Sequence, residues 1–211
     1  MSNFHEKTFV AFLDISGFKE MMKEDDNKAI NALDTLYQAG YDTLIPDKVE
    51  GFFISDCGIL FARGADTNSE NTISQRLKEI LDAIKTINLK MLGKGYMLTT
   101  SVSYGDFDYA SKLEFPGISK SPIYGNAYVQ AYFDQEKGKP RIQPGECRIV
   151  MEHFPSNDIT LDDSDFNLLR QKGKHLYFYW NLRSAVEIDD FERRYKNSKY
   201  SGMLAVLRES M

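Results

Sequence analysis

An apolar run near the start of the chain constrains the fold more than any other feature. Thr8–Ile15 consists of apolar and β-favouring residues, and its one charged side chain, Asp14, stands next to its end. Such a run is typical of a central strand that is buried on both faces. Ser16-Gly17 then interrupts the pattern. The sequence therefore predicts a strand that delivers one carboxylate to its end, where a ligand can reach it.

A second carboxylate stands in a predicted hairpin. Two β-like runs, Val49–Ile54 and Ile59–Ala62, are joined by a short connection that contains Asp56 and Gly58. Asp and Gly between two apolar runs are typical of a hairpin turn. Asp56 is therefore expected at the tip of a hairpin, in the same kind of position as Asp14.

The order of the predicted elements indicates an α+β fold. Apolar residues at helical spacing predict a helical region over about 18–44, with a break near 24–27, and a helix over Ile73–Leu92. Met97–Tyr104 is a further predicted strand. The order strand, helix, hairpin, helix, strand is typical of a split βαβ, ferredoxin-like core. In that core, helices cover a mostly antiparallel sheet.

The remaining residues predict one domain. The elements expected after Tyr109 are a helix over Ile123–Glu136, strands at Arg148–Glu152 and Leu176–Trp180, and a helix over Ala185–Tyr195. The sequence contains no repeat, low-complexity tract or linker. We therefore predict a single domain over residues 1–211, with a core at about 8–150 and an extension at about 151–211.

Composition excludes several classes of protein. The 211 residues are 42% hydrophobic and 27% charged, as in an ordinary globular domain, and the net charge of −5 argues against a general affinity for nucleic acid or an anionic membrane. The first residues resemble no signal peptide, and no run is long enough to span a membrane. Two cysteines, Cys57 and Cys147, form no disulfide framework. We expect a reduced, cytoplasmic protein.

Two carboxylates near one sheet edge are suited to bind metal ions and phosphate. Mg²⁺ and Mn²⁺ prefer oxygen ligands and often combine a few carboxylates with the phosphates of a substrate. The backbone N–H groups of Ser16, Gly17 and Phe18 would begin a helix, a position that favours phosphate. The alternative is that both aspartates are ordinary turn residues and that Ser16-Gly17 only caps a helix.

These segments resemble the metal-binding motifs of class III nucleotidyl cyclases. Phe12–Phe18 is similar to the first motif and Ile54–Ile59 to the second. Ser101–Asp106 is similar to a later strand of the family, and Pro122–Ala127 to the start of the helix that follows. The resemblance covers about residues 8–150 in the order of the family.

The resemblance implies a reaction and a set of ligands. Asp14 and Asp56, with the backbone carbonyl of Ile15, would hold two divalent ions, Mn²⁺ or Mg²⁺. The amides of 16–18 would bind the β- and γ-phosphates. The 3′-hydroxyl of a nucleoside triphosphate would attack its own α-phosphate, giving a 3′,5′-cyclic nucleotide and pyrophosphate.

The residues that would contact the nucleotide base differ from those of adenylyl and guanylyl cyclases. Phe52 stands where those enzymes carry Lys or Glu, and Pro122 where a second base-reading residue falls. Val129 and Phe133 replace an Asn and an Arg that contact ribose and phosphate. Arg141 is either a substitute for the lost positive charge or a surface residue.

This combination resembles the bacterial antiphage pyrimidine cyclases of the Pycsar system. That resemblance implies a homodimer with composite sites, in which Asp14 and Asp56 of one chain face Phe52 and Thr99 of the other as base contacts. Thr99 stands where several of those enzymes carry Arg. UTP is the first predicted substrate, converted to cyclic UMP as a messenger that a separate effector protein reads in antiphage defence.

Several alternatives remain open at the level of the sequence. The chain could be a cytidylate cyclase acting on CTP, an adenylate or guanylate cyclase with unusual base contacts, or a dinucleotide cyclase. A further alternative is an inactive, cyclase-like nucleotide-binding module, which the missing Asn and Arg would permit.

Overall fold

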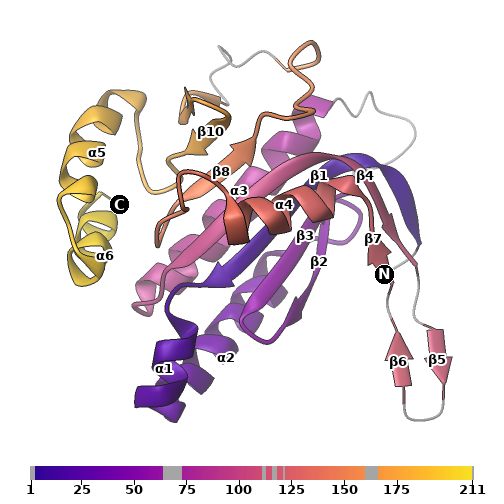
Figure 1. Ribbon diagram of the computed structural model, residues 1–211, viewed down its shortest axis with the longest axis horizontal. Coiled ribbons are helices and arrows are strands. Elements are labelled where there is room, and N and C mark those ends of the chain that lie inside the picture. Colours follow the sequence, from indigo (N-terminus) through magenta and orange to yellow (C-terminus); the bar gives the residue numbers. More distant parts are fainter. Residues whose placement is uncertain are drawn as a thin grey trace.

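A mostly antiparallel eight-stranded sheet forms the centre of the computed structural model (Figure 1). The structure describes residues 3–63, 73–110, 113–115, 118–120, 122–159 and 166–210. The two long strands, β1 (Phe4–Ile15) and β4 (Leu98–Tyr109), pair antiparallel along their whole length. The strand order is β2-β3-β1-β4-β8-β10-β9, and β7 pairs with the end of β4.

The other strands are short. They are β2 (Val49–Ile54), β3 (Cys57–Ala62), β7 (Ile123–Tyr124), β8 (Cys147–Val150), β9 (Leu169–Lys172) and β10 (His175–Phe178). Strand β8 runs parallel to β4, whereas the other pairs are antiparallel. A separate pair, β5 (Leu113–Phe115) and β6 (Ile118–Lys120), projects from one end of the molecule (Figure 1).

Helices cover both faces of the sheet (Figure 1). They are α1 (Phe18–Glu24), α2 (Asp26–Thr43), α3 (Ile73–Gly93), α4 (Asn126–Lys137), α5 (Ile188–Lys196) and α6 (Tyr200–Glu209). The long helices α2 and α3 share one face, α4 crosses the other, and α5 and α6 stand at the β8–β10 end of the sheet. None of the described helices is long and apolar enough to cross a membrane.

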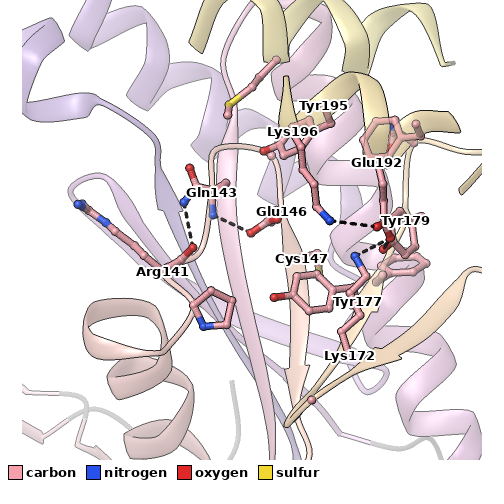
Figure 2. Close-up of a pocket in the computed structure, with 17 residues that line it drawn as sticks. Arg141, Gln143, Glu146, Cys147, Lys172, Tyr177, Tyr179, Glu192, Tyr195 and Lys196 are labelled. Carbon is pink, nitrogen blue, oxygen red and sulfur yellow. Dashed lines mark hydrogen bonds and ion pairs between the residues drawn. The ribbon is translucent and has the colours of Figure 1, made fainter. Parts of the chain in front are cut away.

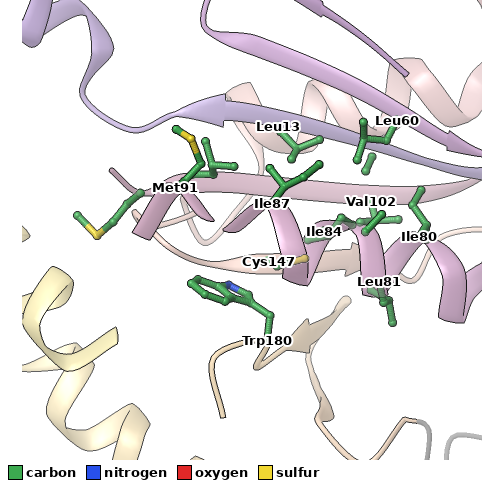
Figure 3. Close-up of a cluster of buried hydrophobic side chains, with 14 of the residues drawn as sticks. Leu13, Leu60, Ile80, Leu81, Ile84, Ile87, Met91, Val102, Cys147 and Trp180 are labelled. Atoms are coloured by element: carbon green, nitrogen blue, oxygen red, sulfur yellow. The ribbon is translucent and has the colours of Figure 1, made fainter. Parts of the chain in front are cut away.

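Alternation along β1 explains why the strand is buried on both faces. Phe9, Ala11 and Leu13 belong to the large core under α2 and α3, whereas Val10 and Phe12 belong to a smaller cluster under α4. Figure 3 shows the large core, in which Leu13 and Val102 of the two central strands lie close to Ile84 and Ile87 of α3. The predicted α+β class with a mainly antiparallel sheet is confirmed.

The structure differs from the predicted elements mainly at their ends. The helical region over 18–44 is divided at the predicted break, because Asp25 is extended and its side chain accepts a hydrogen bond from the Lys28 N–H. The hairpin turn is shorter than predicted, so β3 begins at Cys57. Strand β9 and helix α6 were not predicted; the polar sequence of β9 carries little strand signal.

Candidate metal and phosphate site

The end of β1 brings Asp14 against the tip of the β2–β3 hairpin. Asp14 lies opposite Cys57 of β3, and the Ile15 N–H donates to the Asp56 carbonyl at 3.0 Å. The turn itself is held by the Tyr37 hydroxyl, which donates to the Ser55 carbonyl at 3.0 Å. Backbone pairing therefore fixes the position of both carboxylates.

The two carboxylates and a thiol form one cluster. Ligand atoms of Asp14, Asp56 and Cys57 all lie within 4.8 Å of one another. Carboxylate oxygens at this spacing fit a hard divalent cation such as Mg²⁺ or Mn²⁺. Ile15, whose carbonyl the family resemblance proposes as a further ligand, lines a polar cavity together with Asp14.

The electrostatics of the cluster also favour a cation. Burial, followed by the charges of Asp56 and Glu136, raises the pKa of Asp14 to about 7, and Lys19 opposes the shift. Burial, followed by the charges of Asp14, Asp56 and Glu136, raises the pKa of the Cys57 thiol to about 12. Neither aspartate forms an ion pair with a lysine or arginine in the described part of the chain. A bound cation would relieve this repulsion.

The loop that follows β1 offers two of the three proposed amides. The Ser16 N–H already donates to the Met97 carbonyl at 2.9 Å, so it is not available to a phosphate. The N–H groups of Gly17 and Phe18 have no acceptor among the described residues. Gly17 has a φ of 77°, a left-handed conformation that favours glycine and turns the chain into α1. The Tyr200 hydroxyl of α6 donates to the Ser16 carbonyl at 2.9 Å.

A polar cavity of about 430 Å³ opens beside this loop. One wall consists of 14–17 and Thr99, and the other consists of Gln135, Glu136 and the segment 141–144. Sequence reasoning missed Gln135 and Glu136, because only the packing of α4 across β1 and β4 brings them here. Arg141 does line the cavity, and it forms no ion pair with a described residue.

Thr99 lines the polar cavity of its own chain. It is directly opposite Asp14 in the β1–β4 ladder, and its hydroxyl accepts a hydrogen bond from the Gln135 amide. The sequence had placed it across a subunit boundary from Asp14. The register instead puts Thr99 beside Asp14 of the same chain.

Phe52 lies apart from Asp14 in the same chain. It is half-buried on the edge strand β2, with strand β3 between it and β1. Its ring stacks on Tyr109, with 5.9 Å between the ring centroids. Within one chain, the structure thus joins Asp14, Asp56 and Thr99 and leaves Phe52 outside the cluster.

The two α4 residues at the unusual positions face outward. Val129 is 42% exposed and Phe133 is 51% exposed. Neither lines the polar cavity of its own chain. Both side chains are therefore apolar and exposed on the outer side of α4.

Comparisons with known proteins identify the fold. No protein-family model matches the sequence, and no curated protein matches it. The guanylyl cyclase Cya2 aligns over 84% of this chain and 93% of its own, with a TM-score of 0.53 and 12% identity. A bacterial light-regulated adenylyl cyclase aligns over 99% and 100%, with a TM-score of 0.54 and 12% identity.

A nucleotide complex is among the similar structures. The guanylate cyclase domain of RhGC from Catenaria anguillulae, solved with GTP, aligns over 71% of this chain and 80% of its own. Its TM-score is 0.52 and its identity 15%. The chain therefore has the fold of class III nucleotide cyclase cores.

Proposed function

We propose that this protein is a metal-dependent nucleotide cyclase that acts as a homodimer. The observation that carries the proposal is the pairing of Asp14 and Asp56 at the end of β1, next to the free amides of Gly17 and Phe18. This arrangement occurs on a fold shared with adenylyl and guanylyl cyclases. The missing base-reading residues favour UTP as substrate, with CTP as the second choice.

The proposed reaction is an intramolecular displacement at phosphorus. The 3′-oxygen of the ribose forms a bond to the α-phosphorus, the bond between that phosphorus and the bridging α,β-oxygen breaks, and pyrophosphate leaves. The proton of the 3′-hydroxyl passes to solvent. When bound, two divalent ions would activate the attacking oxygen and neutralise the leaving pyrophosphate.

The residues of the chain position the substrate. Asp14 and Asp56 hold the ions, while the Gly17 and Phe18 amides donate to the terminal phosphates. Thr99 and Gln135 line the cavity beside Asp14, so we assign them to the ribose and phosphate end. Arg141, which lines the same cavity, is the candidate for the positive charge that Phe133 cannot supply.

The base contact is proposed to come from the partner subunit. Phe52 is half-buried and stacked on Tyr109, so an aromatic surface is already ordered at this position. A stacking surface holds a base without hydrogen-bonding its edge, and an aromatic side chain fills the space that a purine would occupy. The exposed apolar residues of α4 are the proposed dimer contact.

The biological role follows from the resemblance alone. By that resemblance, the product is cyclic UMP, and a separately encoded effector protein reads it in antiphage defence. The effector protein takes no part in the cyclisation, so the cyclase activity and the biological role are tested by separate experiments.

The decisive experiment is a substrate screen. Purified protein is incubated with each of the four ribonucleoside triphosphates and Mn²⁺, and cyclic products are identified by mass spectrometry. We expect cyclic UMP in excess of the other three products, and none from Asp56→Asn. Asp34→Asn is the matched control, because Asp34 is exposed on α2 and distant in sequence from the cluster. A folded dimer that cyclises none of the four would refute the enzyme proposal.

The alternative function is a nucleotide-binding module without turnover. It is favoured by the apolar Val129 and Phe133, which offer no hydrogen bond to ribose or phosphate. Saturable binding of a triphosphate with Mn²⁺, lost in Asp14→Asn and without any cyclic product, would establish this alternative.

A further inference from the structure

A thiol joins the two carboxylates at the end of β1. Cys57 is the first residue of β3 and lies directly opposite Asp14 in the β1–β3 ladder. Side chains that stand opposite each other in an antiparallel pair lie on the same face, about 4.5–5.5 Å apart at Cβ. The Cys57 thiol therefore shares one face with Asp14, and its sulfur lies within 4.8 Å of a carboxylate oxygen of both Asp14 and Asp56.

These three donors differ from the all-oxygen set that Mg²⁺ and Mn²⁺ prefer. Zn²⁺ binds thiolate sulfur at about 2.3 Å and carboxylate oxygen at about 2.0–2.2 Å, in a tetrahedron whose donor atoms lie about 3.5 Å apart. Because the three donors of the chain already lie within 4.8 Å of one another, side-chain rotations that close them by about 1 Å complete three corners of that tetrahedron. Sulfur ligands favour Zn²⁺ over Mn²⁺, and Zn²⁺ also exceeds Mn²⁺ in general affinity for such sites.

The Cys57 thiol has no competing partner in the described part of the chain. It forms no disulfide, and its sulfur takes part in no hydrogen bond with a described residue. Burial and the neighbouring carboxylates raise its pKa, and a bound divalent ion offsets those negative charges. When the Sγ–Zn bond forms, the S–H bond breaks and the proton passes to solvent.

The other cysteine has different surroundings (Figure 2). Cys147 of β8 is 1% exposed, at the wall of a separate cavity between the sheet and α5. Its neighbour Glu146 accepts a hydrogen bond from the Gln143 N–H at 2.8 Å, which Figure 2 shows as a dashed line. Among the described residues, no group of three potential metal ligands includes Cys147. Because the sequence contains no third cysteine, Cys147 is the matched control for Cys57.

We propose that Asp14, Asp56 and Cys57 form a binding site for Zn²⁺, in which Cys57 is the third protein ligand and Zn²⁺ acts as an inhibitor. Three protein ligands leave one open position on a tetrahedral ion, whereas the proposed reaction uses two ions that both contact the substrate. Zn²⁺ held in this way displaces Mn²⁺ and stops cyclisation. The binding of Zn²⁺ stands by itself, whereas the inhibition rests on the proposed cyclase function.

The thiolate ligand is tested by absorption spectroscopy with Co²⁺ in place of Zn²⁺. Co²⁺ bound to a thiolate gives a charge-transfer band in the near ultraviolet. When the full chain is titrated, we expect this band to saturate at one thiolate-bound ion per chain and to disappear when Zn²⁺ is added. Cys57→Ser should abolish the band and Cys147→Ala should keep it. Absence of the band from the unchanged protein, or its survival in Cys57→Ser, would overturn the proposal.

The preference for Zn²⁺ is tested by calorimetry with Zn²⁺ and Mn²⁺. Loss of a partner behind a metal ligand already costs about 10- to 100-fold in affinity, so Cys57→Ser, which removes a ligand, should weaken Zn²⁺ binding by about 100-fold. It should weaken Mn²⁺ binding far less, because Mn²⁺ prefers oxygen ligands. Equal losses for the two metals, or no loss for Zn²⁺, would contradict the role of Cys57. Circular dichroism checks the fold of the variant, and Cys57→Ala replaces it if Cys57→Ser is unfolded.

The inhibition is tested with Mn²⁺ and UTP, at free Zn²⁺ concentrations that a chelator buffer sets. Each protein is compared with its own activity in the absence of Zn²⁺. We expect Zn²⁺ to inhibit the unchanged protein and Cys147→Ala alike, and Cys57→Ser to need about 100-fold more Zn²⁺ for the same inhibition. Equal sensitivity of Cys57→Ser and the unchanged protein would refute the inhibition through Cys57. If the chain cyclises nothing, the Co²⁺ spectrum and the calorimetry still decide the Zn²⁺ site.

Discussion

Two aspartates on the α4 side of the sheet have opposite surroundings. Asp14 sits beside Asp56 with no ion-pair partner in the described chain, and its pKa is raised to about 7. Asp134 of α4 is buried, whereas Asp14 is half-buried, and Asp134 is surrounded by donors. Burial raises the pKa of Asp134, yet hydrogen bonds from His175, Arg148 and Ser101 outweigh it and bring the pKa to about 2.

The donors around Asp134 come from three strands. Arg148 of β8 contributes Nε at 2.8 Å and Nη2 at 2.9 Å, and His175 of β10 contributes Nε2 at 2.8 Å. Ser101 of β4 donates at 2.6 Å. Arg148 also donates to the Pro140 carbonyl at 2.6 Å. This carboxylate is therefore satisfied and holds α4 to the sheet, whereas Asp14 is left available for a cation.

The largest effect is expected from Asp14→Asn. Loss of a metal ligand should reduce turnover by about 10³-fold or more, the scale of groups that act on the transition state. The metal-free protein should become slightly more stable, because repulsion between Asp14 and Asp56 is removed. Cyclase rate and the urea midpoint are the two measurements. Loss of activity together with loss of stability would show that Asp14 is structural, like Asp134.

The opposite pattern is expected from Asp134→Asn. Removing the charge leaves Arg148 buried without its counterion, so unfolding free energy should fall by about 3–5 kcal/mol. Urea denaturation with Asp189→Asn as control measures this, since Asp189 pairs with Arg170 at an exposed position. A loss of less than about 1 kcal/mol would contradict the structural role that we assign to the network.

The two aspartates also predict opposite slopes of stability with pH. The folded pKa of Asp14 lies above its ordinary value of 3.8, so the folded state binds the extra proton between about pH 4 and 7. Its contribution is present at low pH and is lost as the pH rises through about 7. The folded pKa of Asp134 is about 2, so its contribution is present above pH 3.8 and is lost as the pH falls toward 2.

Mn²⁺ should change the pH dependence of stability that comes from Asp14 and leave that from Asp134 unchanged. A cation competes with the proton on Asp14, so thermal stabilisation by Mn²⁺ should increase as the pH is raised through 7. Differential scanning fluorimetry between pH 5.5 and 8.5, with Asp14→Asn as the control, measures this. Equal stabilisation of the unchanged protein and of Asp14→Asn would show that Mn²⁺ binds at a site other than Asp14.

The contrast also explains which parts were predictable from sequence. Asp14 and Asp56 each follow a local signal, an apolar strand and a hairpin turn, and strand pairing then brings them together. The partners of Asp134 lie 14 to 41 residues away in sequence, on strands whose neighbours no local pattern specifies. The sequence contains no periodicity that joins Ser101, Arg148 and His175.

The same reasoning accounts for Thr99 and the C-terminal segment. The strand containing Thr99 was predicted, but its register against β1 was not, and the register decides that Thr99 lies opposite Asp14. Helix α6 was not predicted, although its Tyr200 contacts the Ser16 loop. That contact joins residues 184 positions apart, so it depends on tertiary packing alone.

The smallest effect is expected from Ser101→Ala. Ser101 gives Asp134 one neutral hydrogen bond, while Arg148 gives it a charge-assisted pair. Its removal should lower the unfolding free energy by about 1 kcal/mol and leave turnover nearly unchanged, because Asp134 keeps its other donors. Ser103→Ala is the matched control: Ser103 is equally buried in β4 but donates to the Ala127 carbonyl at the start of α4. Only Ser101→Ala should raise the acid midpoint of unfolding, because only that hydroxyl helps to keep the pKa of Asp134 low. Equal acid midpoints for the two variants would show that Arg148 and His175 alone set the charge of Asp134.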